Sequence, residues 1–143
     1  MIRYLTSGES HGKAMLAILD GIPSGLRVEE SKINTDLSRR MRGYGRGKRM
    51  KIEADKAQIL SGLRKSVTIG SPITLIVNNV DQSMDKLPAV LCPRPGHADL
   101  SGAIKYDLKD MRSVLERASA RETVARVAVG AVAKALLAEF SID

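Results

Sequence analysis

The sequence predicts an α+β fold, with strands concentrated early in the chain and a long helix near its end. Three observations support this class. Short apolar runs occupy Ala14–Asp20 and Pro72–Val77, small apolar residues recur at helical spacing in Ala120–Phe140, and glycine-rich polar segments separate them. With 143 residues and 43% hydrophobic composition, the chain can bury one core, so we expect a single domain over residues 1–143.

The first two predicted elements are a strand and a helix. Ala14–Asp20 is apolar and is closed by the glycines and proline of Gly21–Gly25, which is typical of a strand followed by a turn. Apolar side chains then recur every four residues from Glu29 to Met41, the period of an amphipathic helix. Acids at its start and arginines at its end suit the helix dipole, and Gly43 is expected to end it.

The middle of the chain is less regular. Ile52–Leu63 fits a strand and a helix equally well. Pro72–Val77 is rich in β-branched residues and predicts a buried strand, followed by a turn at Asn78–Asn79. Two prolines and a glycine exclude regular structure from Cys92–Gly96.

The last predicted element is the long helix Ala120–Phe140. On the opposite side from its apolar face, Glu122 and Arg126 are spaced as an i,i+4 ion pair. Ser119 is expected to cap its start. The apolar face is lined by small side chains: Val124, Val127, Ala128, Ala131, Ala135 and Ala138.

The composition and the apolar runs indicate in which cellular compartment the protein is expected. The one cysteine, Cys92, has no partner for an internal disulfide, which favours a reducing compartment. The N-terminus lacks the charged and apolar regions of a signal peptide, and the apolar runs are shorter than the ~20 residues of a membrane helix. These features predict a soluble, cytoplasmic protein.

The positive charge is concentrated in one segment. The formal net charge is +7, and the segment Arg39–Lys51 alone holds seven basic residues and no acid. Interleaved glycines would allow several guanidinium groups to converge on one compact, strongly anionic partner. A solvated run of charge and a Gly-Arg loop that binds RNA are the alternatives. The aromatic content of 3% argues against base stacking in a nucleic-acid-binding module.

A histidine lies in the glycine-rich segment Gly8–Gly12. His11 is flanked by a glycine and a serine, where the backbone can approach a ligand closely, and histidine transfers protons near neutral pH. A turn with a solvated histidine is the alternative. The adjacent Ser10 does not indicate a hydrolase, since neighbouring residues of an extended loop point apart.

Two later segments also carry candidate groups. Arg94–Asp99 places His97 three residues after an arginine in a stiff proline-glycine frame, although Asp99 could simply cap the following helix. Glu116–Thr123 places two arginines among small residues at the start of the long helix, where free N–H groups favour an anion. A capped helix start explains the same residues.

Together these segments resemble the chorismate synthase family. Gly8–Gly12, followed by Asp20-Gly21-Ile22-Pro23, resembles its first signature, and Arg117–Thr123, running on to Gly130-Ala131, resembles its second. Arg94–Asp99 and Gly43–Gly47 resemble family blocks and lie in the expected order. Because family members are much longer, we expect residues 1–143 to be the N-terminal part of a longer fold. The chain alone is expected to be inactive, because the later Arg-x-Asp-Pro block and most later flavin-binding residues are absent.

The resemblance implies a fold, an activity and a set of site residues. The fold is a β-α-β sandwich with helices held between sheets, assembled as a homotetramer. The activity is the 1,4-elimination of phosphate from 5-enolpyruvylshikimate 3-phosphate to give chorismate, in aromatic amino acid biosynthesis. The cofactor is reduced FMN, with an association with NADP and no metal ion.

The implied site residues fall into three groups. His11 and His97 match the two catalytic histidines that transfer protons to the reduced flavin and the departing phosphate. Arg117, Ala118 and Ser119 match a stretch that contacts FMN. The arginines that gather round the small-molecule substrate are Arg40, Arg46, Arg49, Arg94 and Arg121.

Overall fold

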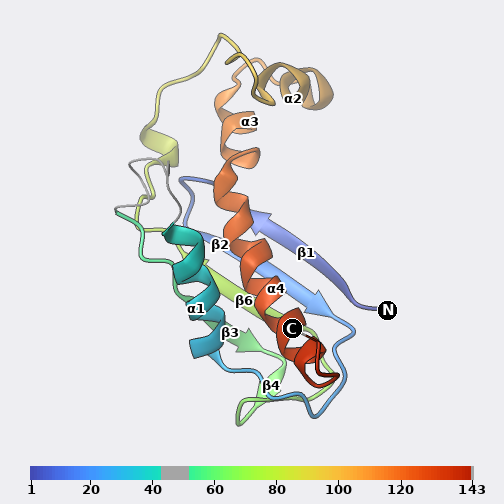
Figure 1. Cartoon of the computed structure of the whole chain (residues 1–143). Coiled ribbons are helices and arrows are strands. Elements are labelled where there is room, and N and C mark those ends of the chain that lie inside the picture. The colour runs from blue at the N-terminus through green and yellow to red at the C-terminus, as the bar shows by residue number, and fades with distance from the viewer. Residues whose placement is uncertain (43–51, 143) are drawn as a thin grey trace.

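The computed structural model describes residues 1–42 and 52–142 (Figure 1). Its main element is a four-stranded sheet with the order β1-β2-β6-β3, in which all neighbouring strands are antiparallel. The four strands are β1 (Arg3–Gly8), β2 (Ala14–Asp20), β3 (Ala57–Ser61) and β6 (Ile73–Asn78). The α+β class is therefore confirmed, and the ambiguous Ile52–Leu63 segment contains a strand rather than a helix.

Side chains alternate across this sheet as the pleat requires. In β2, Met15, Ala17 and Leu19 are buried, while the intervening Ile18 is 44% exposed. The register pairs Met15 with Val77 and Ala17 with Leu75 of β6, so the buried residues of the central strands share one face. That face forms the sheet's side of the core.

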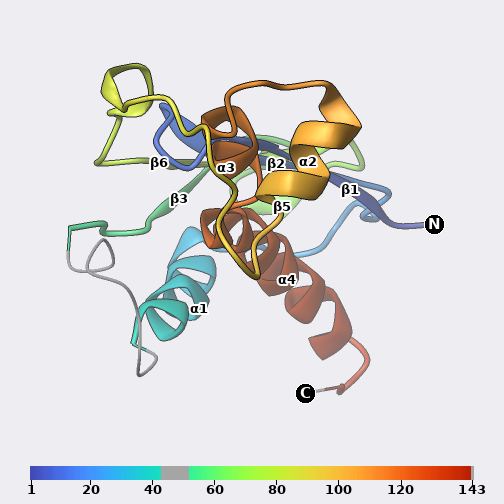
Figure 2. The same ribbon diagram turned by 90° about the horizontal axis from the view of Figure 1, so that it is seen from above.

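Two helices cover this face. α1 (Glu30–Met41) and α4 (Thr123–Ala138) pack against each other and against the sheet, and Figure 2 shows both on the same side of the strands. Ile33 and Leu37 of α1 are buried, as their spacing predicted. The third buried position of α1 is Arg40 rather than Met41, which indicates an internal partner for that cation.

The buried face of α4 (Thr123–Ala138) agrees with the predicted one only in part, since Val127 and Ala135 are half-buried and Ala138 is exposed. A short 3-10 turn, η3 (Ala120–Glu122), precedes the helix, and Ser119 caps it by accepting a hydrogen bond from the main-chain N–H of Arg121 at 3.2 Å. The Glu122–Arg126 ion pair at 2.6 Å confirms the predicted i,i+4 pair, whereas Ser119 caps the 3-10 turn and α4 itself has no side-chain cap. The buried residues are Val124, Ala125, Ala128, Val129, Ala131 and Val132, because α4 contacts both α1 and the sheet.

The opposite face of the sheet is apolar and exposed. Leu5 and Ile18 are paired across β1 and β2, with 69% and 44% of their surfaces exposed. No helix packs on this face within residues 1–42 and 52–142. The described part of the chain thus shows one sheet against helices, and the second sheet of the implied sandwich is not among its elements.

The remaining elements are short. β4 (Leu63–Arg64) and β5 (Val67–Thr68) form a two-stranded hairpin, and η2 (Met84–Lys86) follows β6. α2 (Asp99–Tyr106) and α3 (Arg112–Arg117) lie beyond one end of the sheet (Figure 1). The segment Cys92–Gly96 contains no helix or strand, as predicted. None of the helices in the described ranges is long and apolar enough to cross a membrane.

Two local predictions were wrong. Asn78 ends β6 instead of starting a turn, and Asn79 is buried, because its side chain hydrogen-bonds to three carbonyl groups of another loop. Asp99 does not cap α2: the helix has no side-chain cap, since the Asp99 carboxylate is occupied by ion pairs. The predicted end of α1 at Gly43 lies outside the described residues.

Candidate functional site

The loop between β1 and β2 carries His11 and is held from below by Asn79. The Asn79 side-chain amide donates to the carbonyl oxygens of Glu9, Ser10 and Gly12 at 3.1, 3.2 and 2.8 Å. Gly8 starts the loop with a φ of 112°, and a Cβ there would collide with the Ala14 carbonyl oxygen. The loop therefore has a fixed path.

The His11 ring is held by a buried carboxylate. Glu116, near the end of α3, contacts Nδ1 of His11 with Oε1 at 2.9 Å and with Oε2 at 3.0 Å. Oε2 also accepts the main-chain N–H of His11 at 2.7 Å. On the other side of the ring, Asp81 Oδ2 lies 3.8 Å from Nε2. His11 is thus placed between two carboxylates, an arrangement suited to a group that exchanges protons.

A buried cluster of charges lies under this loop. The Asp55 carboxylate bridges two arginines: Oδ2 pairs with Arg40 at 3.1 Å and Oδ1 with Arg121 at 2.5 Å. Arg121 also lies 3.5 Å from Glu53, and Glu53 accepts the main-chain N–H of Val80 at 2.8 Å. These four charged side chains are at most 6% exposed. The cluster joins α1, the segment before β3 and the start of α4.

Two of the predicted substrate arginines are therefore internal in this structure. Arg40 also donates to the Thr123 hydroxyl at 3.0 Å and to the Ala120 carbonyl at 3.1 Å. Arg121 donates its Nε–H to the Asn79 side-chain oxygen at 2.8 Å. Through Asn79, the charge cluster is connected to the His11 loop.

The second histidine belongs to a separate cluster. His97 Nδ1 lies 2.6 Å from Asp99 Oδ1, and Arg94 pairs with Asp99 through Nε at 2.8 Å. The Arg94 guanidinium lowers the pKa of the fully buried Asp99 carboxyl well below its usual range, although burial opposes the shift. Asp99 in turn raises the pKa of Arg94. The Arg94 side chain remains 45% exposed, so this cluster faces solvent on one side.

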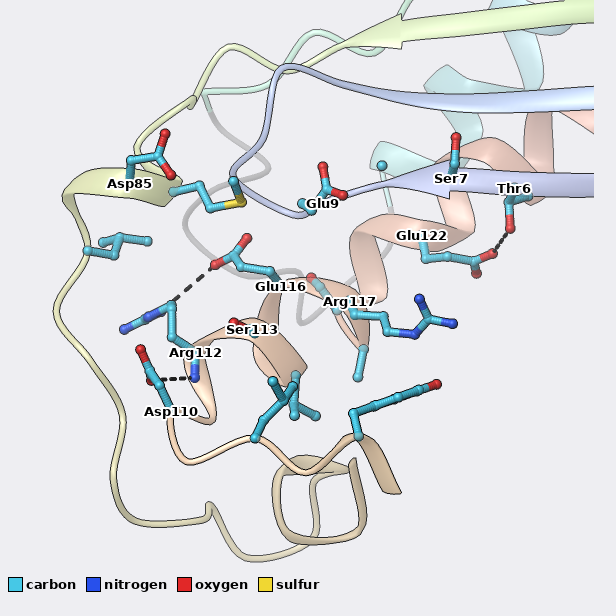
Figure 3. Close-up of a pocket in the computed structure, with 18 of the residues that line it drawn as sticks. Thr6, Ser7, Glu9, Asp85, Asp110, Arg112, Ser113, Glu116, Arg117 and Glu122 are labelled. Carbon is cyan, nitrogen blue, oxygen red and sulfur yellow. Dashed lines mark hydrogen bonds and ion pairs between the residues drawn. The ribbon is translucent and has the colours of Figure 1, made fainter. Parts of the chain in front are cut away.

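A cavity of about 940 Å³ lies between β1 and the helices α2 and α3 (Figure 3). Arg117, Ala118 and Ser119, the three predicted cofactor residues, all line it. The Arg117 guanidinium lies 5.1 Å from the centre of the Tyr106 ring. Within the described ranges, no carboxylate comes within ion-pair distance of Arg117, so its charge is available to an anion.

The cavity also holds charges that neutralise one another. Glu122 accepts a hydrogen bond from the Thr6 hydroxyl at 2.8 Å and pairs with Arg126 at 2.6 Å. Arg112 lies 3.9 Å from Glu116, and Figure 3 shows the Glu116 side chain extending toward the loop that carries Glu9. The wall beside Arg117 is therefore the part of the cavity best suited to bind negative charge.

His11 lines a second cavity of about 600 Å³ rather than the first. The two cavities adjoin, because they share the lining residues Ser7, Gly8, Glu9, Met84 and Asp85. Glu116 links them: it lines the larger cavity and holds the histidine of the smaller one. In the described ranges, no group of three or more histidine, cysteine or acidic side chains could hold a metal ion.

The structure does not bring all the predicted residues to one place. His11 and the 117–119 segment line adjoining cavities, while Arg40 and Arg121 lie beneath the His11 loop. Arg94 and His97 form a cluster of their own, and none of the contacts between described residues joins it to His11. Arg46 and Arg49 lie outside the described residues.

Sequence reasoning missed four important polar residues. Glu53, Asp55, Asn79 and Glu116 carry the contacts that organise the site, and all four are buried. The sequence feature that could have indicated them is their position. Glu53 and Asp55 are charged residues beside the apolar run that begins at Ala57, where an unpaired charge is costly to bury. Such a pattern indicates that these carboxylates have buried partners, but it does not identify the partner residues.

Comparisons with known proteins agree over the whole chain. The family model described as chorismate synthase matches residues 2–143. The chain is 56% identical to the chorismate synthase of Geobacter sulfurreducens, covering 100% of this chain and 39% of that protein. It is 58% identical to that of Thermoanaerobacter pseudethanolicus, covering 99% of this chain and 41% of the relative.

A solved structure gives the same result. A crystal structure of chorismate synthase superposes with a TM-score of 0.79 at 51% sequence identity, covering 98% of this chain and 35% of that one. The chain thus spans about two fifths of the length of the curated relatives it matches. Nothing in these comparisons supports nucleic-acid binding by the Arg39–Lys51 segment.

Proposed function

The chain belongs to the chorismate synthase family, and on that premise we propose that the protein carrying it is a lyase that forms chorismate. The proposed reaction removes phosphate and a proton from 5-enolpyruvylshikimate 3-phosphate in a 1,4-elimination, within aromatic amino acid biosynthesis. The observation that carries the proposal is the family match over residues 2–143, with identities above 50%.

The charge distribution supports a substrate with two carboxylates and a phosphate. Of the proposed substrate-binding arginines that lie in the described ranges, Arg94 is the partly exposed one, and its neighbour His97 is one of the two proposed catalytic histidines. A phosphate leaves more easily when a guanidinium and a proton donor neutralise its growing charge. The proposal also keeps Arg46, Arg49, Arg40 and Arg121 as substrate-binding residues. The burial of the last two adds a second role, which is to hold the framework under the His11 loop.

We propose that reduced FMN binds in the 940 Å³ cavity. Its volume lies within the range of about 300–1,000 Å³ usual for cofactor sites. Ala118 and Ser119 are small enough for a flat ring to approach the backbone, and Arg117 supplies a cation for the phosphate tail. When bound, reduced FMN supplies an electron-rich surface beside the substrate, with no net redox change in the reaction. The residues present fit this cofactor.

The two proposed catalytic histidines have the same kind of support. His11 Nδ1 lies against Glu116, and His97 Nδ1 lies against Asp99. A carboxylate at one ring nitrogen orients the imidazole, and in His11 it leaves Nε2 to exchange protons. In His97 the other ring nitrogen, Nε2, lies 3.1 Å from the Arg94 guanidinium. Each histidine is thus proposed to hold or deliver one proton during the elimination.

The direct test joins this chain to the remaining three fifths of the Geobacter sulfurreducens relative and measures chorismate formation. With reduced FMN we expect turnover, and oxidised FMN serves as the control. His11→Ala and His97→Ala should each slow turnover by about 10²–10⁴-fold, the usual effect of a positioned proton donor. A folded, FMN-loaded protein that forms no chorismate would contradict the proposal. Unchanged turnover in one histidine variant would remove that histidine from the mechanism.

The chain by itself is expected to bind FMN weakly, because residues 117–119 supply one edge of the family's flavin site. A flavin fluorescence titration measures this affinity, with Arg117→Ala as the variant that should weaken it further. Micromolar binding by the 143-residue chain would contradict the expectation and place most of the site in this chain.

We further propose that the complete protein is a cytoplasmic homotetramer. The exposed apolar sheet face that includes Leu5 and Ile18 supports association with further protein surface. Light scattering on the joined protein measures its mass in solution, and a monomeric mass would contradict the assembly.

A further inference from the structure

Glu116 makes an unusual pair of contacts with one residue. Its side chain is only 3% exposed, and both of its oxygens lie against His11. Oε2 accepts the main-chain N–H of His11 at 2.7 Å, and Oε1 lies 2.9 Å from the ring Nδ1. An ionised carboxylate accepts hydrogen bonds but donates none, so the ring nitrogen that faces it must carry a proton.

We propose that Glu116 is the positioning residue of His11 and selects which ring nitrogen exchanges protons. In neutral His11, the Glu116 carboxylate holds the hydrogen on Nδ1, which leaves Nε2 as the nitrogen available for proton transfer. This inference rests on the proposed role of His11 in the elimination, and it deepens that role by assigning the choice of tautomer to Glu116.

The groups around the ring support the assignment. Arg112 lies 3.9 Å from Glu116 Oε1, so a cation stands beside the carboxylate. Asp81 Oδ2, at 3.8 Å from Nε2, is too far away for a hydrogen bond that would compete for the ring orientation. Among the residues that the structure describes, the short contacts of the ring are therefore those with Glu116.

The loop keeps its place without the Glu116 side chain. The main-chain N–H of Ser10 donates to the main-chain carbonyl of Glu116 at 3.1 Å, a bond that any substitution at residue 116 retains. Met84 donates its main-chain N–H to the His11 carbonyl at 3.1 Å, and Asn79 binds the loop from below. Glutamine at residue 116 retains these bonds and also keeps an oxygen for the main-chain N–H of His11, so this substitution changes the contact with the ring while the loop keeps its hydrogen bonds.

Glu116→Gln makes a specific prediction about the proton. Glutamine has the same shape but one oxygen, while the carboxylate serves two donors of His11. The main-chain N–H of His11 always donates, so the amide oxygen turns to it and the NH₂ group faces Nδ1. With the NH₂ group in the place of Oε1, 2.9 Å from Nδ1, we expect Nδ1 to accept and the hydrogen of neutral His11 to move to Nε2.

Nitrogen NMR measures this directly. The chain contains two histidines, so [¹⁵N]histidine labelling gives two imidazoles, and a His97→Gln chain assigns them. We expect the hydrogen on Nδ1 in the unmodified chain and on Nε2 in Glu116→Gln. Glu139→Gln, the same change at an exposed position beyond α4, is the matched control and should leave His11 unchanged. Circular dichroism verifies that each chain is folded.

Turnover of the joined protein gives the functional readout. Glu116→Gln should lower kcat by at least about 10-fold, the lower range for lost orienting partners. The upper bound is about 10⁴-fold, the loss in serine proteases when the carboxylate that holds the histidine tautomer becomes an amide. KM should change little. Glu116→Asp retains the charge and should keep the hydrogen on Nδ1 and recover part of kcat.

The outcomes separate the two proposals. An Nε2-protonated neutral His11 in the unmodified chain, or an unchanged tautomer in folded Glu116→Gln, overturns the role of Glu116. Should Glu116→Gln not fold, the unmodified chain and Glu116→Asp still decide the tautomer. If the tautomer switches as expected but His11→Ala leaves turnover unchanged, Glu116 positions the ring and the catalytic role of His11 is wrong.

Discussion

Arg121 donates its Nε–H to the side-chain oxygen of Asn79 at 2.8 Å, and both side chains are buried. This bond fixes the orientation of the Asn79 amide, so that its NH₂ group points at the carbonyls of the His11 loop. The start of α4, the end of β6 and the loop after β1 are thereby connected through one asparagine. Substitutions in the buried charge cluster should therefore also alter the position or mobility of the His11 loop.

Asn79→Ala should loosen that loop. The substitution removes the amide that donates to three loop carbonyls and the oxygen that accepts the Arg121 Nε–H, and the loss of a buried polar partner costs about 1–3 kcal/mol. We expect a lower free energy of unfolding in urea and faster hydrogen exchange at residues 9–12. Asn78→Ala, the exposed neighbour of the same type, is the control. Equal effects of the two substitutions would show that Asn79 does not organise the loop.

Arg40→Ala should lower the free energy of unfolding more than Arg39→Ala, the removal of an exposed arginine. Arg40 pairs with buried Asp55, and breaking a buried ion pair costs about 3–5 kcal/mol. Because Asp55 keeps its pair with Arg121, we expect the lower end of that range. Arg39→Ala removes an exposed pair with Asp36 and should cost about 1 kcal/mol at most. Urea unfolding followed by circular dichroism compares the two variants.

The same variants test the proposed substrate contact. A raised KM in Arg40→Ala at an unchanged free energy of unfolding would make Arg40 a substrate ligand without a structural role. A loss of stability at an unchanged KM would make it purely structural.

Asp99→Asn should remove an acid-sensitive part of the stability. Arg94 lowers the pKa of Asp99 below its usual 3.8, so the unfolded chain binds this proton more tightly than the folded one. The stabilisation is therefore complete above about pH 5 and is lost as the pH falls through the unfolded pKa toward the lower folded pKa. Wild type should lose more stability than Asp99→Asn between about pH 5 and pH 2.

Thermal unfolding followed by circular dichroism across that pH range measures the difference. Asp107→Asn, at the exposed end of the same helix, is the matched control and should follow wild type. An Asp99→Asn variant with the wild-type pH dependence would show that the Arg94–Asp99 pair does not contribute to acid stability.

Arg49→Ala should impair the joined enzyme, while Lys48→Ala should change it little. The family resemblance aligns Arg49 with a substrate-binding position, and a charge-assisted guanidinium contact contributes about 1.5–3 kcal/mol, or roughly ten- to a hundredfold in kcat/KM. A solvated lysine acts through a screened field, so its effect should nearly vanish at physiological salt. Steady-state kinetics at two salt concentrations measures both. Equal losses would mean that the segment acts as a diffuse patch of charge.

The sequence by itself determined the elements with clear periodicity. Ala14–Asp20 is a strand with the predicted bounds, and Ile33 and Leu37 form the buried stripe of α1. The signatures at residues 8–12 and 117–123 also identified the family, because such motifs are local in the chain. Periodicity and motifs report which face of an element is buried and which residue types stand together.

Only the tertiary structure decided which polar groups pair. His11 and Glu116 are separated by 105 residues, and Asp55 and Arg121 by 66, so no local pattern relates them. The same reason explains the two wrong predictions. Asn79 has the local propensity of a turn residue, but its side chain binds the carbonyls of the His11 loop. Asp99 has the local propensity of a helix cap, but its carboxylate binds Arg94 and His97. Burial without water requires each polar group to find a partner, and the folded chain alone determines which partner is within reach.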